Sequence, residues 1–298
     1  MLVIGSRGSQ LALWQARWVQ ARLAELGEES RIDIIHTTGD KVLDVALSKV
    51  GTKGLFTKEI EEALLAGSID LAVHSLKDMP TELPHALTLA AIPAREDPRD
   101  AMVGRRLTGL RQGALVGTSS LRRAAQLKAL RPDLDIQNIR GNVDTRLRKL
   151  DEGLFEAIVL AAAGLRRLGW ADRITEYLEP GVMCPAVGQG ALAIETRDDG
   201  GHAFEVCRKL NDAATETCVK AERAVLAALG GGCQVPIGAH ATLGKTLRLI
   251  AVVVSPDGSS VIRKVQEEQA GNAEELGRAM GAELLAAGGR EILEAVYS

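Results

Sequence analysis

One cysteine stands out by the way the chain presents it. Cys233 follows three consecutive glycines, residues 230–232, and precedes Gln234-Val235-Pro236-Ile237-Gly238. Consecutive glycines permit positive φ angles and close approach of the backbone to a ligand, although they cost conformational entropy. Pro236 fixes one φ angle on the other side of the thiol. Two interpretations are open: a buried free cysteine in a tight turn, which is common for a single cysteine, or a thiolate that carries a group covalently.

A carboxylate in a second stretch is also placed where chemistry can occur. The apolar strand pattern of residues 69–73 ends in His74-Ser75-Leu76-Lys77-Asp78-Met79-Pro80. In open α/β sheets, ligands bind where strands end in polar residues. Adjacent Lys77 and Asp78 would elsewhere often form a surface ion pair of no consequence. Their position directly after an apolar strand favours a ligand site.

The third feature is a basic segment. Residues 105–149 hold eleven Lys or Arg and three acids, a charge of +8 within a chain of net charge -3. Three strand-to-helix turns carry hydroxyls or arginines: Thr118-Ser119-Ser120-Leu121-Arg122-Arg123, Arg140-Gly141-Asn142-Val143-Asp144-Thr145-Arg146 and Gly164-Leu165-Arg166-Arg167.

Parallel strands align such turns along one edge of a sheet, and the planar guanidinium binds carboxylate or phosphate through two hydrogen bonds. Solvated helix-surface arginines explain Arg131 and Arg148 but not the whole set. The pattern therefore predicts an edge that binds a polyanion.

Two further segments could assist in anion binding. Apolar spacing predicts a helix from about Leu11 to Leu26, with Ser9 at its N-cap and Arg7 just before it. The free N–H groups and dipole of such a helix end attract anions, although capping alone would explain Ser9. Residues 47–58 carry Lys49, Lys53 and Lys58 around two glycines, either as a lid over an anionic ligand or as a solvated connection.

The order of these patterns predicts the domain organisation. Charged, proline-rich residues 93–100 and glycine-bracketed residues 183–190 look like two crossings between domains. The patterns from 237 to 266 are typical of antiparallel strands. We expect an α/β fold with two α/β domains, 1–95 plus 191–212 and 96–190, and a small α+β domain, 213–298, that delivers Cys233.

Composition narrows the functional class. Aromatic residues make up only 3% of the 298 residues, which leaves few stacking platforms for bases. The four cysteines show no CxxC or His-spaced pair, so we expect no metal site, no disulfide scaffold and a reducing compartment. The chain opens as a strand and shows no apolar run of about 18–20 residues. These features predict a cytoplasmic protein without a membrane partner.

Taken together and in order, the motifs resemble the porphobilinogen deaminase (hydroxymethylbilane synthase) family nearly from end to end. The resemblance is carried by residues 6–15 (SRGSQLALWQ), 54–59 (GLFTKE), 74–80 (HSLKDMP), 117–123 (GTSSLRR), 140–146 (RGNVDTR), 185–191 (PAVGQGA) and Gly232-Cys233. Cys184 is not a position associated with the family, and no role is assigned to it.

The resemblance implies two domains like periplasmic binding proteins and a third that carries the cofactor. Cys233 would be joined by a thioether to a dipyrromethane built from two substrate units. Four porphobilinogens would then be condensed head to tail with loss of ammonia, and water would release the linear tetrapyrrole hydroxymethylbilane. The acetate and propionate of each pyrrole account for the arginine-rich edge. The resemblance further implies a monomeric transferase whose partner is a small molecule.

Functional residues carry over by position. As catalytic residues, the resemblance implies Asp78, Arg7 and Lys77, with Asp78 at the pyrrole nitrogens. Cofactor contacts fall on Cys233, Ser75, Lys77, Asp78, Thr118, Ser119, Ser120, Arg122, Arg123, Arg140 and Gly141. Substrate contacts fall on Arg7, Ser9, Gln15, Phe56, Arg140, Arg146, Arg167 and Gln189, and Lys49 and Lys53 belong to the loop over the site.

Three other classes of function compete with this interpretation. A binding or ligand-sensing protein with two α/β lobes would leave Gly232-Cys233 unexplained. Nucleic-acid binding by the basic segment is disfavoured by the negative net charge and the scarcity of aromatic residues. A cysteine protease or acyl-transferase needs a base paired with the thiol, and the five histidines give no hint of one.

Because an anchored product must grow, we also expect motion in residues 48–58 and in the crossings near 93–100 and 185–200.

Overall fold

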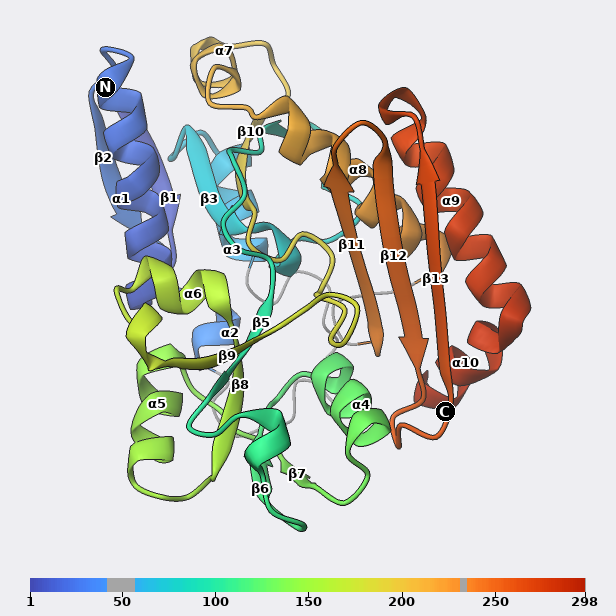
Figure 1. The fold of residues 1–298 in the computed structure, drawn as a ribbon. Helices are drawn as coiled ribbons and strands as arrows, with labels where there is room; N and C mark the ends of the chain where they lie inside the picture. Colours follow the sequence, from blue (N-terminus) through green and yellow to red (C-terminus); the bar gives the residue numbers. More distant parts are fainter. Residues whose placement is uncertain (42–56, 231–234, 298) are drawn as a thin grey trace. The chain divides into compact units, whose positions relative to one another are not determined.

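The computed structural model describes residues 1–41, 57–230 and 235–297 (Figure 1). Cys233, Phe56, Lys49 and Lys53 lie outside the described residues. The chain forms two compact units, residues 1–96 with 191–216 and residues 97–190 with 217–298. The chain passes between them at 96/97, inside the first predicted crossing, at 190/191, at the end of the second, and again at 216/217 within a helix.

The first unit is built on a mixed five-stranded sheet of order β2-β1-β3-β10-β4. β1 runs parallel to β2 and β3, whereas β10 runs antiparallel to β3 and β4. The bounds are β1 Leu2–Ser6, β2 Ser30–Ile34, β3 Leu71–Ser75, β4 Leu87–Ala91 and β10 Leu192–Arg197. β10, which lies between β3 and β4 in this sheet, therefore belongs to the part of the chain that follows the second crossing.

Helices cover this sheet with the apolar faces that the sequence pattern contains. Ala16, Val19 and Leu23 of α1 are fully buried in one core with Ile4 of β1, and Leu26 is exposed because the helix ends at Glu25. Ile60 and Leu64 of α3 form a second core. The helices are α1 Gln10–Glu25, α2 Thr38–Lys41, α3 Lys58–Leu65 and α7 His202–Arg208.

The second unit contains the basic segment in a sheet of order β7-β6-β8-β5-β9. β6 is parallel to β7 and β8, and β5 is antiparallel to β8 and β9. The repeated strand–helix pattern is thus confirmed as three parallel βα units. Its elements are β5 Asp100–Val103, β6 Leu115–Gly117, α4 Leu121–Leu130, β7 Asp135–Gln137, α5 Val143–Asp151, β8 Ala157–Ala161, α6 Ala162–Arg167 and β9 Ile174–Leu178.

The same unit holds an antiparallel meander, β11-β12-β13. Alternate residues of β12 face opposite sides: Leu249 and Val253 join the core with the helices, whereas Ile250 and Val252 pack with Ala125 of α4. The bounds are α8 Ala213–Ala228, β11 Ile237–Leu243, β12 Leu247–Val254, β13 Val261–Glu268, α9 Ala273–Leu284 and α10 Arg290–Tyr297. The predicted fold class, two α/β domains and a small α+β domain, is confirmed.

Candidate functional site

The first unit presents its polar residues where parallel strands end together. β1 and β3 are hydrogen-bonded neighbours, so the turns that follow them lie on one edge of the sheet. After β1, the Ser9 hydroxyl accepts a hydrogen bond of 3.3 Å from the backbone N–H of Ala12 and caps α1. Gln15, one turn into α1, is buried and donates from Nε2 to the Ser75 hydroxyl at the end of β3, at 2.8 Å. The capped helix and the end of β3 are therefore tied together.

Asp78 sits in a single short turn that buried neighbours hold in place. Directly after β3, Leu76–Asp78 form a 3₁₀ turn, and the Leu76 N–H donates to the carbonyl of Ala191 at 3.1 Å. Leu76 and Met79 are buried on either side of the turn. Asp78 itself is exposed, and no described residue forms a hydrogen bond or ion pair with its carboxylate. Buried apolar side chains thus hold a turn whose carboxylate faces solvent. Lys77 precedes Asp78 in this turn, and Arg7 lies in the turn after β1.

The second unit gathers the predicted polyanion edge. β7, β6 and β8 lie side by side and parallel, so the turns at 118–120 and 138–142 and the start of α6 share one edge of the sheet. Thr118 is buried, Ser120 caps α4 and Ser119 is exposed. β5 begins at this edge too, because Asp100 pairs with Ala161 at the end of β8.

Arg122 and Arg123 point inward to a buried carboxylate that the sequence analysis did not identify. Arg122 donates to Asp100 from Nη1 at 2.6 Å, and Arg123 donates from Nε at 2.8 Å. All three side chains are buried. Burial alone would raise the pKa of Asp100, but the charges of the two arginines and the hydrogen bonds hold that pKa well below its usual range. The signal for Asp100 was an acid directly before an apolar strand, at the end of the first crossing.

Two residues predicted to bind substrate are also buried. Gln189 has no exposed surface, and its Nε2 donates to Asp100 at 2.9 Å and to the carbonyl of Pro98 at 2.7 Å. Arg167 donates to the carbonyl of Gly190 at 2.7 Å and is 9% exposed. These bonds hold Gln189 inside the unit, and its direct contact with substrate stays a prediction.

Arg146 differs from these arginines. Its Nε donates to the carbonyl of Gly141 at 2.8 Å, and no acid of the described chain lies within ion-pairing distance of it. Burial and the positive charge of Arg123 lower the pKa of Arg146 to about 10. A half-buried guanidinium that lacks a counter-charge is suited to receive a carboxylate from a ligand. The residues at this edge therefore fit a carboxylate-bearing cofactor.

The cysteines in the described part of the chain do not offer a reactive thiolate. Cys184, Cys207 and Cys218 are all buried and form no disulfide, and burial raises the pKa of Cys184 and of Cys207 to about 12. Cys184 serves the structure through its backbone, because its carbonyl accepts from Arg122 and its N–H donates to Gln126. Within the described ranges no cluster of His, Cys, Asp or Glu could hold a metal ion.

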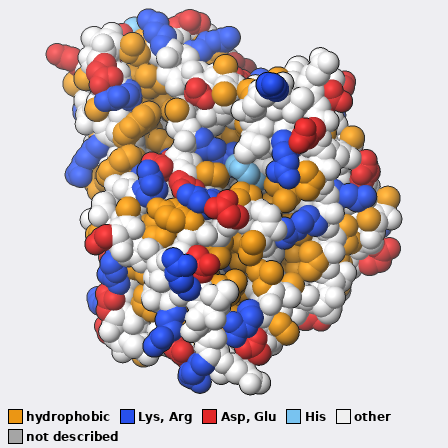
Figure 2. All heavy atoms as spheres, viewed as in Figure 1, with side chains coloured by type: hydrophobic (Ala, Val, Ile, Leu, Met, Phe, Trp, Pro, Cys, Tyr) orange, Lys and Arg blue, Asp and Glu red, His pale blue; other side chains and the backbone are white. Residues whose placement is uncertain are grey.

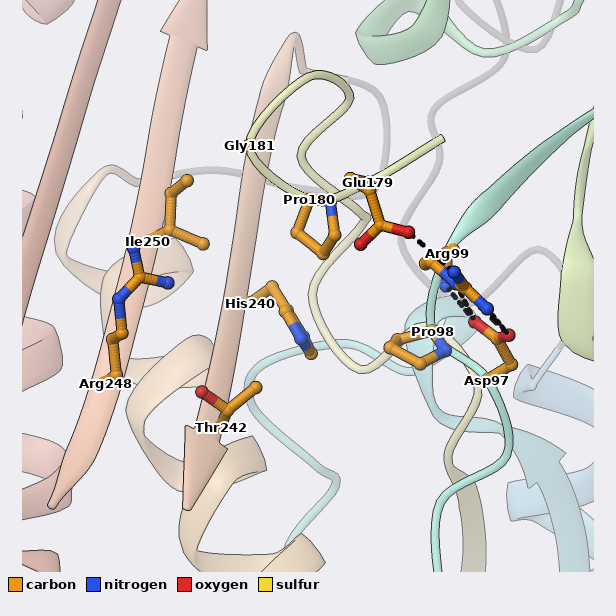
Figure 3. A pocket seen from close by; sticks show the side chains of 10 residues that line it. All are labelled: Asp97, Pro98, Arg99, Glu179, Pro180, Gly181, His240, Thr242, Arg248 and Ile250. Carbon is orange, nitrogen blue, oxygen red and sulfur yellow. Dashed lines mark hydrogen bonds and ion pairs between the residues drawn. The ribbon is translucent and has the colours of Figure 1, made fainter. Parts of the chain in front are cut away.

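A cleft of about 590 Å³ lies elsewhere in the second unit (Figure 3). Its walls come from residues 97–99, residues 179–181 and strands β11 and β12. Figure 3 shows Arg99 directed at two acids; it lies 2.7 Å from Asp97 and 2.6 Å from Glu179. Because this arginine is already neutralised and no predicted site residue lines the cleft, we do not place the active site there.

Comparison with known proteins settles the family. The model described as "Porphobilinogen deaminase, dipyromethane cofactor binding domain" matches residues 2–205, and "Porphobilinogen deaminase, C-terminal domain" matches residues 216–286. The chain belongs to the porphobilinogen deaminase family.

Curated members of the porphobilinogen deaminase family align over almost the whole chain. The porphobilinogen deaminase of Syntrophobacter fumaroxidans is 53% identical over 300 residues, covering 99% of this chain and 97% of the relative. That of Syntrophotalea carbinolica is 54% identical over 301 residues, covering 99% and 96%. Among solved structures, an ABC transporter periplasmic substrate-binding protein from Coxiella burnetii aligns with 70% of this chain and 91% of its own, at 13% identity and a TM-score of 0.44.

Proposed function

We propose that this enzyme condenses four porphobilinogen molecules head to tail, with loss of ammonia, and releases the linear tetrapyrrole hydroxymethylbilane. Condensation would start from a dipyrromethane attached to Cys233. Family membership supports the reaction. The structural observation that carries it is Arg146, a half-buried cation without an acid partner in the described chain, at an edge where three parallel strands end.

The second unit would hold the carboxylates. When bound, dipyrromethane supplies the pyrrole end to which new units are joined, and it carries acetate and propionate groups. Ser119 offers an exposed hydroxyl, and Arg146 offers a guanidinium that lacks an acid partner among the described residues. Gly141 lies in the turn that leads into α5. Thr118, Ser120, Arg122, Arg123 and Arg140 complete the proposed set on the same edge.

The first unit would supply the charge that the reaction needs. As ammonia leaves porphobilinogen, positive charge develops on its ring. A solvent-facing carboxylate such as Asp78 would stabilise this charge and accept a hydrogen bond from the pyrrole nitrogen. Lys77 and Arg7, at the same edge, would bind the acidic side chains, with Ser9 presenting the helix end. Gln15 holds Ser75 through its side-chain amide, and its contact with substrate is part of the proposal.

The remaining roles rest on the family alone. Phe56 as a substrate contact, and Lys49 and Lys53 as parts of a loop over the site, are proposals about residues outside the described chain. We also propose the domain limits 1–95 plus 191–212, 96–190 and 213–298, motion at the two crossings, and a monomeric, cytoplasmic enzyme.

Two observations bear on the partners of this enzyme. No helix among the described residues is both long and apolar enough to cross a membrane. On the face shown in Figure 2, Lys and Arg alternate with Asp and Glu rather than forming one continuous basic surface. The mixed charges on this face agree with a small-molecule substrate rather than nucleic acid as the partner.

Intact mass tests the proposal directly. The parent protein should carry an excess mass equal to two deaminated pyrrole units, and Cys233→Ser should lack it. Cys184→Ser is the matched control and should retain the excess, because the Cys184 thiol is buried with a raised pKa. A parent that stays unmodified and inactive after incubation with porphobilinogen would refute the proposal.

A further inference from the structure

Asp100 is the most heavily bonded carboxylate at the polyanion edge. It accepts from Arg122 Nη1 and Nη2 at 2.6 and 3.3 Å, from Arg123 Nε at 2.8 Å and from Gln189 Nε2 at 2.9 Å. Its side chain has no exposed surface. An ionised carboxylate is stable in such a place only when its lone pairs are satisfied by charged donors, so these contacts depend on one another.

The same cluster reaches both crossings. Gln189, in the second crossing, bonds Asp100 and also the carbonyl of Pro98 in the first crossing. Arg122 donates from Nη1 to the carbonyl of Cys184 at 2.6 Å, at the start of the second crossing. The first turn of α4 is therefore tied through Asp100 to both segments that connect the sheets.

Fixing these arginines in advance matters for binding. A long arginine side chain loses rotamer entropy when it is immobilised. If the fold has already immobilised the side chain, ligand binding does not have to offset this loss of entropy. Asp100 also balances one of the two adjacent positive charges, which would otherwise repel each other in a buried place.

We propose that Asp100 is a positioning residue, which holds the guanidinium groups of Arg122 and Arg123 where they bind a ligand carboxylate without touching the ligand itself. This inference rests on the proposed function. Gln189, which donates to Asp100, would position the two arginines indirectly by holding Asp100. The positioning role also predicts that removing either group weakens binding more than it slows the chemical step.

The test uses Asp100→Asn and the milder Gln189→Leu, each as the full-length protein. The control is Asp133→Asn, which breaks another Arg–Asp pair of the same sheet domain, that with Arg131, away from the strand-end edge. Three quantities are measured: thermal stability, the rate at which cofactor-free protein gains the dipyrromethane mass on incubation with porphobilinogen, and KM and kcat of the loaded fraction.

We expect Asp100→Asn to raise KM and slow the mass gain by roughly tenfold or more, and Gln189→Leu by several-fold, with smaller changes in kcat. Asp133→Asn should match the parent. A purely structural role would lower stability but leave the KM of the folded, loaded enzyme within about twofold of the parent, which would overturn the inference.

The variants also distinguish a failure of the positioning role from a failure of the proposed function. If Asp100→Asn does not fold, Gln189→Leu decides: a KM and a rate of mass gain like those of the parent would refute the positioning role. If the parent itself neither gains pyrrole mass nor turns over, the proposed function fails first. If the parent and Asp133→Asn work and both test variants behave like them, only the role of Asp100 fails.

Discussion

The side-chain amide of Gln15 donates to the hydroxyl of Ser75 across 2.8 Å, and this bond joins helix α1 to the end of the strand that leads to Asp78. Gln15 is 2% exposed, so its end of the bond is shielded from water. It fixes α1, the helix after β1, against the end of β3. The turn that carries Asp78 therefore depends on a bond from a residue sixty positions before Ser75.

Gln15→Leu should lower the free energy of unfolding by about 1 kcal/mol and reduce turnover several-fold, because the end of β3 loses a fixed donor. A double-mutant cycle with Ser75→Ala, followed by urea unfolding, measures the bond itself. We expect the double variant to lose less stability than the sum of the single variants, by about 0.5 kcal/mol or more. Strict additivity would show that the two side chains do not act together.

Asp78→Asn should lower kcat by at least about a hundredfold, since it removes the charge opposite a developing cation. Stability should change by less than about 0.5 kcal/mol, because the exposed carboxylate has no partner among the described residues. Steady-state kinetics and thermal unfolding of the same preparation check both. Asp172→Asn, at another exposed acid, is the control, and a variant at Asp78 with near-normal kcat would remove that residue from its role.

Arg146→Gln should stabilise the cofactor-free protein while weakening substrate binding. The pKa of Arg146 is lowered to about 10 in the folded state, so its charge costs stability at every pH below that value. The cost is relieved as the pH rises from about 10 toward the unfolded value. In a Cys233→Ser background, we expect Arg146→Gln to raise the free energy of unfolding at neutral pH by on the order of 1 kcal/mol.

The stability difference between Arg146→Gln and its parent should shrink above about pH 10, measured by urea unfolding over a pH series. Arg148→Gln is the matched control on the same helix, because Arg148 is exposed and pairs with Glu152 at 3.7 Å. It should change stability by no more than about 0.5 kcal/mol at any pH. A loss of stability in Arg146→Gln would mean that its charge is compensated in the folded protein.

Gly141→Ala should be more damaging than Gly153→Ala, although both glycines have positive φ angles of 110° and 76°. A Cβ at position 141 would lie 2.6 Å from Cγ2 of Thr145, whereas a Cβ at 153 meets nothing within 4 Å. We expect a loss of roughly 2–4 kcal/mol at 141 and about 1 kcal/mol at 153. KM should rise only for Gly141→Ala, which moves the turn between Arg140 and Arg146. Equal losses at the two positions would show that the contact with Thr145 is unimportant.

Local patterns were sufficient for much of the fold. The alternation of apolar residues predicted α1 within one residue at each end, and turn chemistry predicted the three βα units and the final meander. These features depend on contacts between residues that are close in the chain, so the spacing of apolar and turn residues predicts them directly. The same holds for Ser9 and Ser120, whose capping roles follow from their place before a helix.

What the sequence determined by itself was the chemical inventory: a cysteine in a glycine loop, a carboxylate after β3, and arginines after parallel strands. Only the tertiary structure decided which arginines are engaged internally. Arg122 and Arg146 look alike in the sequence. Arg122 is bonded to Asp100, which the antiparallel pairing of β5 with β8 places at this edge of the sheet. Arg146 lacks an acid partner in the described chain. The physical reason is that a charge in a folded protein is defined by its neighbours in space, and strand order sets those neighbours.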